Sequence, residues 1–394
     1  MAAADGRRRL HLGVSLQGAG HHPAAWRVPG ARPERLFTAD HVVELVQTAE
    51  RGTLDLVVLE DSFAPQPRHA HRVRGRLDAL LTLARVAPRT TAIGLVPTVD
   101  VTHTEPFHVS KNVATLDLVS QGRAGWRIGL STGAAEARLF GRKPAAPTAE
   151  LVEEADDAAE VVARLWDSWD DDAVIRDRST GRYVDREKLH YVDFEGRLFS
   201  VRGPSITPRP PQGQPVVVVD ATTADETLTL AATRADVALV EAPDVTTATA
   251  ARDTIRRRAD AAGRPADEIT VLAVVDVLLD ADPATARRER DRLDRLDGGT
   301  PPAPGTVDFV GTPEGLVGLA QEWFAGGAVD GFLLRPARLP HDLDQVVDEV
   351  VPRLRDRGLF RRIYEGRTLR DHLGLARPAS RYAATGGTNG QERR

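Results

Sequence analysis

The stretch LDLVVLE, residues 54–60, decides the fold, because it is a continuous apolar run that ends in an acid. An unbroken apolar run of this length is expected for a strand of a parallel sheet that is covered on both faces. Segments with helical spacing of apolar residues lie on either side, at residues 40–51 and 77–86. The sequence therefore predicts an alternation of strands and helices around this strand.

Short β-branched runs and longer helical segments alternate through the rest of the chain. The further expected strands are residues 10–16, 91–98, 125–130, 215–219, 237–240, 270–279 and 331–336. The further expected helices are residues 106–119, 149–169, 224–233 and 343–357. About eight strand–helix units favour a (β/α)₈ barrel, in which function resides at the carboxyl ends of the strands. No Gly-x-Gly-x-x-Gly follows the first strand, which disfavours a dinucleotide-binding sheet.

A single barrel domain is expected to span residues 1–375, with two insertions. One insertion, residues 170–211, is polar, and the other, residues 294–304, is rich in Gly and Pro. Long excursions from compact folds are often lids, although a solvated loop is an equal alternative here. Residues 376–394 are mostly small and polar, which is typical of a flexible tail.

Composition disfavours several classes of protein. The 394 residues carry a formal net charge of −5 with both signs mixed, which argues against binding to nucleic acid or anionic membranes. The chain has no cysteine, so disulfides and thiolate metal sites are excluded. No apolar stretch reaches the ~18 residues of a membrane span, and the N-terminus does not resemble a signal peptide. A cytoplasmic protein is expected.

A short catalytic pattern follows the fourth expected strand. Residues 129–133 read GLSTG, which matches the Gly-x-Ser-x-Gly turn that presents a nucleophile, here Ser131, in many hydrolases. Acids and His372 lie downstream, so a serine hydrolase is one alternative. Patterns of this length also arise by chance in a chain with 33 glycines. No histidines have a zinc spacing, and no metal site is predicted.

Longer stretches resemble a known family. GAGHHPAAWR (residues 18–27) followed by AERGTLDLVVLED (residues 49–61) resembles the opening of the luciferase-like flavin monooxygenases. The resemblance is to the branch with nitrilotriacetate monooxygenase, the pristinamycin synthase large subunit and the sulfone monooxygenase of desulfurisation. It continues through EPFHVSKNVATLDLVSQGRAGW (105–126), LWDSWDDDAVIRD (165–177), FSVRGPSITPRPPQGQPV (199–216) and VPRLRDRGLFRRIYEGRTLRDHLGL (351–375).

The resemblance implies a (β/α)₈ barrel that holds reduced FMN on its carboxyl-end face. It implies a monooxygenase that acts with O₂ on a small organic substrate and receives its flavin from a separate reductase. The family's flavin contacts correspond to Asp61 after the second strand, Thr98 at the end of the third, Thr102 in the next loop and Ser131 after the fourth. Ser131 would then face flavin, and the protein would hold the flavin and exclude water.

Several flavin-contact positions depart from the family pattern. The fourth strand usually reads Trp-Asn-Val-Val-Thr-Ser, whereas residues 126–131 read WRIGLS, so Arg127 replaces a neutral asparagine. As alternatives, this arginine contacts a flavin carbonyl or an anionic substrate, or it forms an ion pair with a barrel acid such as Asp61. A histidine and a tyrosine that normally follow are replaced by Thr148 and Val152.

The loop that binds the flavin phosphate in the family departs most from the family pattern. The family pattern is close to Gln-Ala-Gly-x-Ser-x-x-Gly-Arg, whereas residues 220–227 read DATTADET. Thr222 and Thr223 offer hydroxyls, and either could cap the following helix. Asp225 and Glu226 lie in its first turn, where they stabilise the helix but repel a phosphate.

These departures leave the function open between three alternatives. The first is the reduced-FMN monooxygenase with a weakened phosphate site, for which His22, His103 and Arg127 are candidate catalytic residues. The second is a flavin-free relative that serves as a partner of an active enzyme or binds a small molecule. The third is the hydrolase that uses Ser131. The resemblance also implies a homodimer, or a heteromer with an active relative.

Overall fold

Eight parallel strands close into a barrel in the computed structural model, which describes residues 8–64, 72–222, 224–298 and 305–383. The strands lie in the order β10-β9-β4-β3-β2-β1-β13-β11, and the pairing of β10 with β11 closes the ring. Their bounds are β1 (His11–Leu16), β2 (Leu56–Leu59), β3 (Gly94–Asp100), β4 (Gly125–Gly129), β9 (Val216–Ala221), β10 (Val237–Val240), β11 (Thr270–Leu279) and β13 (Gly331–Pro336). The predicted (β/α)₈ barrel is confirmed.

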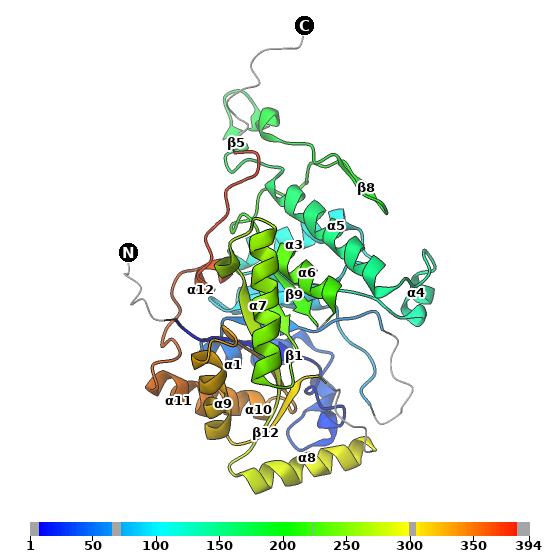
Figure 1. Ribbon diagram of the computed structural model, residues 1–394. Coiled ribbons are helices and arrows are strands. Elements are labelled where there is room, and N and C mark those ends of the chain that lie inside the picture. Colours follow the sequence, from blue (N-terminus) through cyan, green and yellow to red (C-terminus); the bar gives the residue numbers. More distant parts are fainter. Residues whose placement is uncertain (1–7, 65–71, 223, 299–304, 384–394) are drawn as a thin grey trace.

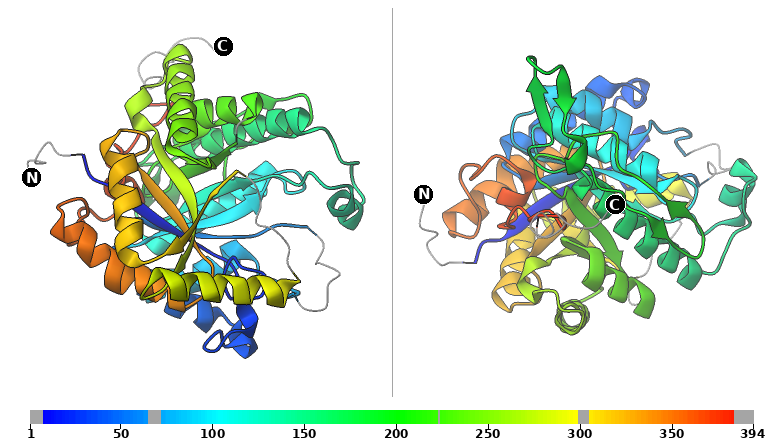
Figure 2. Two further views of the ribbon diagram at one scale, coloured as in Figure 1. Left: turned by 60° about the horizontal axis from the view of Figure 1, so that its bottom comes forward. Right: turned by 90° about the horizontal axis from the view of Figure 1, so that it is seen from above.

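Helices surround the strands (Figure 2). Their bounds are α1 (Ala39–Arg51), α2 (Ala79–Val86), α3 (Pro106–Ser120), α4 (Ala134–Phe140), α5 (Thr148–Asp167), α6 (Asp225–Arg234), α7 (Val245–Ala261), α8 (Pro283–Asp297), α9 (Pro313–Ala325), α10 (His341–Gln345), α11 (Val351–Asp356) and α12 (Leu369–His372). A π-helical turn, η6 (Val346–Val350), joins α10 to α11. The short 3₁₀ helices are η1 (Ala25–Arg27), η2 (Pro33–Arg35), η3 (Ala87–Arg89), η4 (Arg186–Lys188) and η5 (Ala266–Glu268). Within the described ranges, no helix has the length and apolar character needed to cross a membrane.

The interior of the barrel is apolar, and α12 closes its amino end. Inward-facing side chains such as Val58, Val96 and Leu333 form one buried cluster, to which Leu369 on α12 also belongs. A Cβ atom at Gly94, where β3 begins, would clash with Leu369, so this glycine lets α12 approach the strands. In Figure 1, α12 lies at the left of the molecule and α8 at the bottom. The carboxyl ends of the strands therefore form the open mouth of the barrel.

The second predicted insertion, residues 294–304, begins inside a helix. Residues 294–297 are the last turn of α8, and Gly298 ends this helix with a φ of 86°. Residues 299–304 lie outside the described residues. The chain then forms β12 (Val307–Gly311), a strand that the sequence did not predict and that pairs with the outer half of β11.

The first insertion, residues 170–211, folds along α5 instead of across the mouth. It contains two small antiparallel pairs, β5 (Val174–Asp177) with β6 (Arg182–Val184), and β7 (Phe194–Glu195) with β8 (Ser200–Val201). Arg197 of the second hairpin contacts Glu153 on α5 at 2.8 Å. Only the tip of this hairpin, at Leu198 and Phe199, lines a cavity near the mouth.

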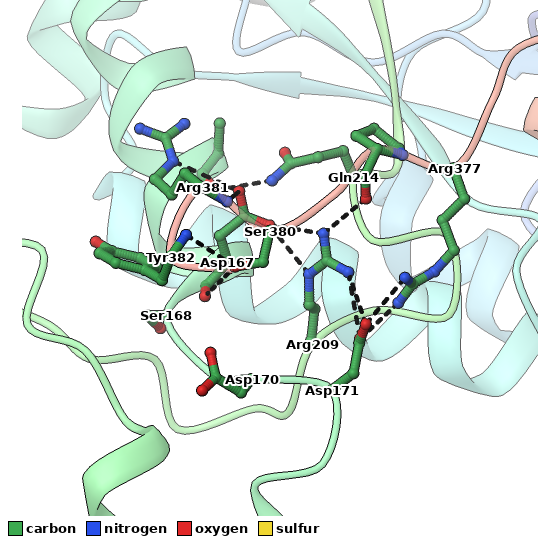
Figure 3. Close-up of polar contacts among 12 residues, drawn as sticks. Asp167, Ser168, Asp170, Asp171, Arg209, Gln214, Arg377, Ser380, Arg381 and Tyr382 are labelled. Carbon is green, nitrogen blue, oxygen red and sulfur yellow. Dashed lines mark hydrogen bonds and ion pairs between the residues drawn. The ribbon is translucent and has the colours of Figure 1, made fainter. Parts of the chain in front are cut away.

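The described part of the tail, residues 376–383, packs on the start of this insertion (Figure 3). The guanidinium of Arg377 donates to both carboxylate oxygens of Asp171, at 2.6 and 3.0 Å. The buried Arg209 donates to Asp167 at 3.0 Å and to the carbonyl of Pro378 at 2.9 Å. The flexible tail expected from residue 376 thus has fixed contacts up to residue 383, and residues 384–394 lie outside the described residues.

Candidate active site at the mouth of the barrel

A layer of polar side chains forms the floor of the mouth. Side chains alternate between the two faces of a strand, so the positions two residues beyond the apolar interior layer also face inward. On the eight strands these positions are Ser15, Glu60, Thr98, Arg127, Asp220, Glu241, Asp276 and Arg335. The polar floor lies directly above the apolar interior, at the end of the barrel where barrel enzymes bind their ligands.

Arg127 on β4 joins two carboxylates of this floor. Its guanidinium donates to Glu60 at 2.6 Å and to Asp220 at 2.8 Å. The hydroxyl of Ser15 donates to the same Glu60 oxygen at 2.7 Å. Burial alone would raise the pKa of Glu60, but Arg127 and these hydrogen bonds lower it to about 2. Of the sequence alternatives for Arg127, the ion pair with a barrel acid is present, although its partners are Glu60 and Asp220 and not Asp61.

Arg335 on β13 joins two further carboxylates. It donates to both oxygens of Asp276 at 2.7 Å, and to Glu241 at 3.2 Å. Two guanidinium groups therefore face four carboxylates, which leaves the floor with two excess negative charges. Burial lowers the pKa of the neighbouring His21, so this imidazole is neutral near pH 7 and does not offset them. Of the floor residues, only Arg127 and Thr98 are predicted site residues. Polar residues at the ends of the other predicted strands were the available signal.

Thr98 has a buried hydroxyl without a hydrogen-bond partner among the described residues. Its side chain is 7% exposed, and its Oγ1 atom has no hydrogen-bond partner among the described residues. It lines a cavity of about 280 Å³ together with Asp61 and Asp100. A second cavity of about 340 Å³ shares Asp61 and extends to His22 and the loop after β1. The predicted contacts Asp61 and Thr98 thus lie side by side at the mouth.

Ser131 lies at the mouth, but its surroundings do not activate a nucleophile. Its hydroxyl donates to Asp100 at 2.6 Å, and its backbone N–H donates to Thr102 at 3.0 Å. A serine nucleophile needs a histidine that accepts its proton. No histidine in the described residues bonds to Ser131, and His372 lies on α12 at the opposite end of the barrel. The strand–turn–helix around Ser131 is real, but the geometry does not support the hydrolase.

The two candidate histidines differ in what their ring nitrogens do. Nδ1 of His22 accepts from the N–H of Ala24 at 3.2 Å, so its Nε2 carries the proton and donates to Asp294 at 3.0 Å. His103 stacks on Phe140 at 4.5 Å between ring centres. Its Nε2 atom is buried and has no partner among the described residues. Of the two, only His103 has a buried ring nitrogen without a hydrogen-bond partner among the described residues.

In the loop expected to hold phosphate, the hydroxyl of Thr222 already has a nearby hydrogen-bond partner. Thr222 shares a hydrogen bond of 2.7 Å with Thr227, and Thr223 lies outside the described residues. The helix α6 begins at Asp225 with Ala224 as its N-cap, so Thr222 does not cap it, and among the described residues no side chain accepts from its first N–H groups. Asp225 pairs with Arg258, whereas Glu226 has no ion pair in the described part of the chain.

The positions of the family's histidine and tyrosine hold Thr148 and Val152 in this chain. Thr148 is the first residue of α5 and is exposed, and Val152 is buried in the core. Neither side chain is the imidazole or the phenol that the family has at these positions. Within the described ranges, no group of three His, Cys, Asp or Glu residues is placed to hold a metal ion.

Comparison with known proteins finds relatives that match nearly the whole chain. The family model for luciferase-like monooxygenases matches residues 10–322. N-acetyl-S-(2-succino)cysteine monooxygenase of Bacillus subtilis is 33% identical, and the match covers 96% of this chain and 99% of the relative. Nitrilotriacetate monooxygenase component A of Aminobacter aminovorans is 32% identical, with 95% and 98% covered. A riboflavin lyase whose structure holds modified FMN and riboflavin superposes with a TM-score of 0.84 at 25% identity, with 95% of this chain and 98% of that chain covered.

Proposed function

The chain belongs to the luciferase-like monooxygenase family and is a monooxygenase, and we propose that it uses reduced FMN and O₂ on a small organic substrate. A separate reductase would supply the flavin. When bound, reduced FMN supplies the electrons that activate O₂. The residues of this chain would hold the flavin, orient the substrate and exclude water.

The observation that carries the proposal is the unpartnered hydroxyl of Thr98 in the polar floor. A buried hydroxyl without a partner costs free energy, and a ligand that hydrogen-bonds to it removes this cost. Asp61 shares the cavity with Thr98, while Thr102 and Ser131 are bonded to each other beside it. These four residues fit the ring end of a flavin. Of the candidate catalytic residues, we favour His103 for proton transfer, because its Nε2 has no hydrogen-bond partner among the described residues.

The phosphate end fits less well. The first turn of α6, which has no side-chain cap among the described residues, offers backbone N–H groups, and these are favourable for an anion. Arg258 offsets the charge of Asp225, but the charge of Glu226 remains. Without glycine, the backbone cannot approach a phosphate as closely as in the family loop. We therefore propose that FMN binds, and that it binds weakly.

The test is the reoxidation of reduced FMN by O₂ in the presence of the protein. FMN is reduced without oxygen, mixed with the chain and exposed to O₂, and flavin absorbance is followed in time. We expect the reoxidation rate to change with protein concentration, and this change to reach a plateau at high protein concentration. A Thr98→Val variant, which removes the hydroxyl but keeps the volume, should need a higher protein concentration to produce the same change in reoxidation rate. Reoxidation identical to that of free FMN at every concentration would contradict the proposal.

The excess negative charge of the floor favours a second candidate. Reduced FMN is anionic, so four carboxylates against two guanidinium groups in the floor oppose it, as Glu226 opposes its phosphate. A flavin-free relative that pairs with an active family member would have these features. This candidate predicts unchanged reoxidation and a stable complex with a catalytic relative. The monooxygenase predicts saturable reoxidation by this chain alone, whether it is a monomer or a homodimer.

A further inference from the structure

A cavity on the β1 side of the mouth lies beside the space assigned to the flavin ring. Its volume is about 340 Å³, and its walls come from the loop after β1, the end of β2 and residues 72–77. Of the predicted flavin contacts among the described residues, only Asp61 lines it. A molecule in this cavity would therefore adjoin the flavin ring without taking the place of the ring.

The loop after β1 holds His21 at the wall of this cavity. Gly20 has a φ of 130°, and a Cβ atom there would lie 2.2 Å from the carbonyl oxygen of Ala337, so only glycine allows this approach. The backbone N–H of His21 donates to the carbonyl of Pro336 at 2.8 Å. Its ring Nε2 donates to the carbonyl of Ser15 on β1 at 3.2 Å. Contacts to β1 and β13 therefore fix the orientation of the imidazole.

The other ring nitrogen of His21 is an acceptor without a donor. A carbonyl oxygen can only accept a hydrogen bond, so Nε2 carries the proton and Nδ1 has the lone pair. Burial has the largest effect on the pKa of His21 and lowers it, although Glu60 opposes this effect, so the ring is neutral near pH 7. No described residue donates to this Nδ1. In contrast, His22 in the same cavity uses both ring nitrogens, for Ala24 and for Asp294.

The charged side chains that line this cavity have opposite charges close by. The ion pairs are Glu60 with Arg127 at 2.6 Å and Arg72 with Asp297 at 2.7 Å. Burial raises the pKa of Asp61, and the charge of Arg76 opposes this effect, so these two charges also offset each other. An ion that entered the cavity would lose its hydration without gaining an unpaired counter-charge from these side chains. The cavity therefore favours an uncharged ligand.

Most of the remaining wall is apolar. It includes Leu16, Leu36, Phe37, Leu59 and the ring of Trp26. The cavity volume is near the lower end of the ~300–1,000 Å³ range of small-molecule pockets, so it suits a compact molecule. Burial of apolar surface would supply most of the affinity of such a molecule. A hydrogen-bond donor on it would satisfy Nδ1 of His21, and a molecule without a donor would leave this nitrogen desolvated and unpaired.

We infer that this cavity is the substrate pocket of the monooxygenase, and that the substrate is an uncharged, largely apolar molecule whose O–H or N–H group donates to Nδ1 of His21. His21 would then select substrates through one hydrogen bond. The assignment of the ligand as substrate rests on the proposed function. Binding of the ligand does not, because it needs no flavin.

Calorimetry of the wild type with indole and benzofuran tests the hydrogen bond. Both molecules are uncharged and have nearly the same size and shape, but only indole has an N–H group. We expect indole to bind roughly tenfold more tightly, because benzofuran leaves Nδ1 of His21 without a partner. Equal binding of the two ligands would overturn the inference, and this comparison needs no variant.

A second pair of ligands tests the preference for an uncharged molecule. Indole-5-carboxamide and indole-5-carboxylate have nearly equal size, but only the carboxylate is an anion. We expect the carboxamide to bind at least roughly tenfold more tightly, because the carboxylate would be desolvated beside guanidinium groups that already have partners. Tighter binding of the carboxylate would show that Arg72 or Arg76 receives an anion, and it would overturn the assignment of an uncharged substrate.

A matched pair of variants locates the donor. His21→Phe keeps a ring in the wall but removes the acceptor. The control is His41→Phe, because Nε2 of His41 also donates to a carbonyl of the loop after β1, that of Gly18 at 3.4 Å, while His41 does not line the cavity. We expect His21→Phe to abolish the roughly tenfold preference for indole over benzofuran, and His41→Phe to retain it. A preference that survives His21→Phe, or that both variants lose equally, would place the donor elsewhere.

The two proposals fail in different ways. If indole is preferred and the preference depends on His21 while the reoxidation of FMN is unaffected by the protein, the binding site stands and the monooxygenase proposal is wrong. If reoxidation is saturable while indole and benzofuran bind equally, the monooxygenase stands and the role of His21 is wrong.

Discussion

The guanidinium of Arg127 on β4 and the carboxylate of Asp220 on β9 face each other across the floor, with three N–O distances between 2.8 and 3.1 Å. The same guanidinium contacts Glu60, whose side chain is 23% exposed. Removing Arg127 would leave the half-buried Glu60 without its counter-charge. The contacts of Arg127 thus indicate that it holds the floor together, in addition to any role toward a ligand.

Arg127→Gln should lower the free energy of unfolding by about 2 kcal/mol at pH 7, because Glu60 loses its counter-charge, while the more exposed Asp220 is partly compensated by water. Chemical denaturation of both proteins measures this. The control is Arg258→Gln, which breaks a more exposed pair with Asp225 and should cost less than about 1 kcal/mol. A cost for Arg127→Gln as small as that of the control would contradict the structural role.

The cost of Arg127→Gln should also depend on pH. The pKa of Glu60 is about 2 in the folded protein, below its ordinary value of 4.5. Its stabilising contribution is therefore complete above pH 4.5 and is lost as the pH falls toward 2. Because the variant lacks this contribution, the difference between the two proteins should shrink as the pH falls below 4.5. Denaturation at pH 7 and at pH 4 compares them.

Thr98→Val should stabilise the ligand-free protein by about 1 kcal/mol, since it replaces an unpartnered buried hydroxyl with a methyl group of equal size. The matched control is Thr102→Val, because the Thr102 hydroxyl accepts from the N–H of Ser131 at 3.0 Å. The control should lose about 1 kcal/mol. Chemical denaturation without ligands decides it, and destabilisation by Thr98→Val would mean that its hydroxyl already has a partner.

The sequence predicted the barrel well because strands covered on both faces leave a strong local signal. The apolar runs of β2 and β11 need no long-range information to be recognised. In contrast, the pairing of Arg127 with Asp220 depends on β4 and β9 being neighbours, although the two residues are 93 positions apart in the chain. The sequence showed that Arg127 replaces a neutral residue, but it could not identify the acids that compensate it.

The path of the insertions could not be predicted for a similar reason. Residues 170–211 carry no periodic signal, and their position along α5 depends on contacts such as that between Arg197 and Glu153. Residues 376–383 look like a frayed end by composition, yet Arg377 pairs with Asp171. Ion pairs between distant segments have no local signature in a sequence.

His372→Leu should reduce the loss of stability at acidic pH. Burial and the nearby Arg361 lower the pKa of His372 to about 4, and neither ring nitrogen has a partner in the described part of the chain. The folded protein keeps this histidine neutral, so its contribution is complete above pH 6.5 and is lost as the pH falls from 6.5 to 4. Between pH 6.5 and 5 the loss is about 2 kcal/mol in the wild type and should be absent in the variant.

Chemical denaturation across this pH range tests the prediction for His372. The exposed His341, on α10, offers the matched control, and His341→Leu should leave the acid dependence as in the wild type. An unchanged acid dependence in His372→Leu would mean that this imidazole is protonated inside the fold.

Truncation before Val351 should unfold the protein and not merely reduce activity. Leu354 and Phe360 are buried in the main core, and Leu369 fills the amino end of the barrel. Losing several such side chains at about 2–5 kcal/mol each exceeds the stability of an ordinary domain. Removal of residues 384–394 is the control and should leave the melting temperature unchanged. A soluble truncation before Val351 that melts cooperatively would contradict this.

Oxidised FMN should bind far more weakly than a complete phosphate cradle would allow, and the protein should be isolated colourless. The loop from Asp220 to Thr227 has no glycine, Thr222 is bonded to Thr227, and the charge of Glu226 opposes the phosphate. Together these are worth about 3 kcal/mol, or roughly two decades of affinity. The double variant Asp225→Gly, Glu226→Gly should recover part of this loss in calorimetry with FMN. Riboflavin, which lacks the phosphate, is the control ligand, because its affinity should be the same for both proteins. Sub-micromolar binding of FMN by the wild type would show that Arg127, Thr222 and the free N–H groups of α6 form a working cradle of a different kind.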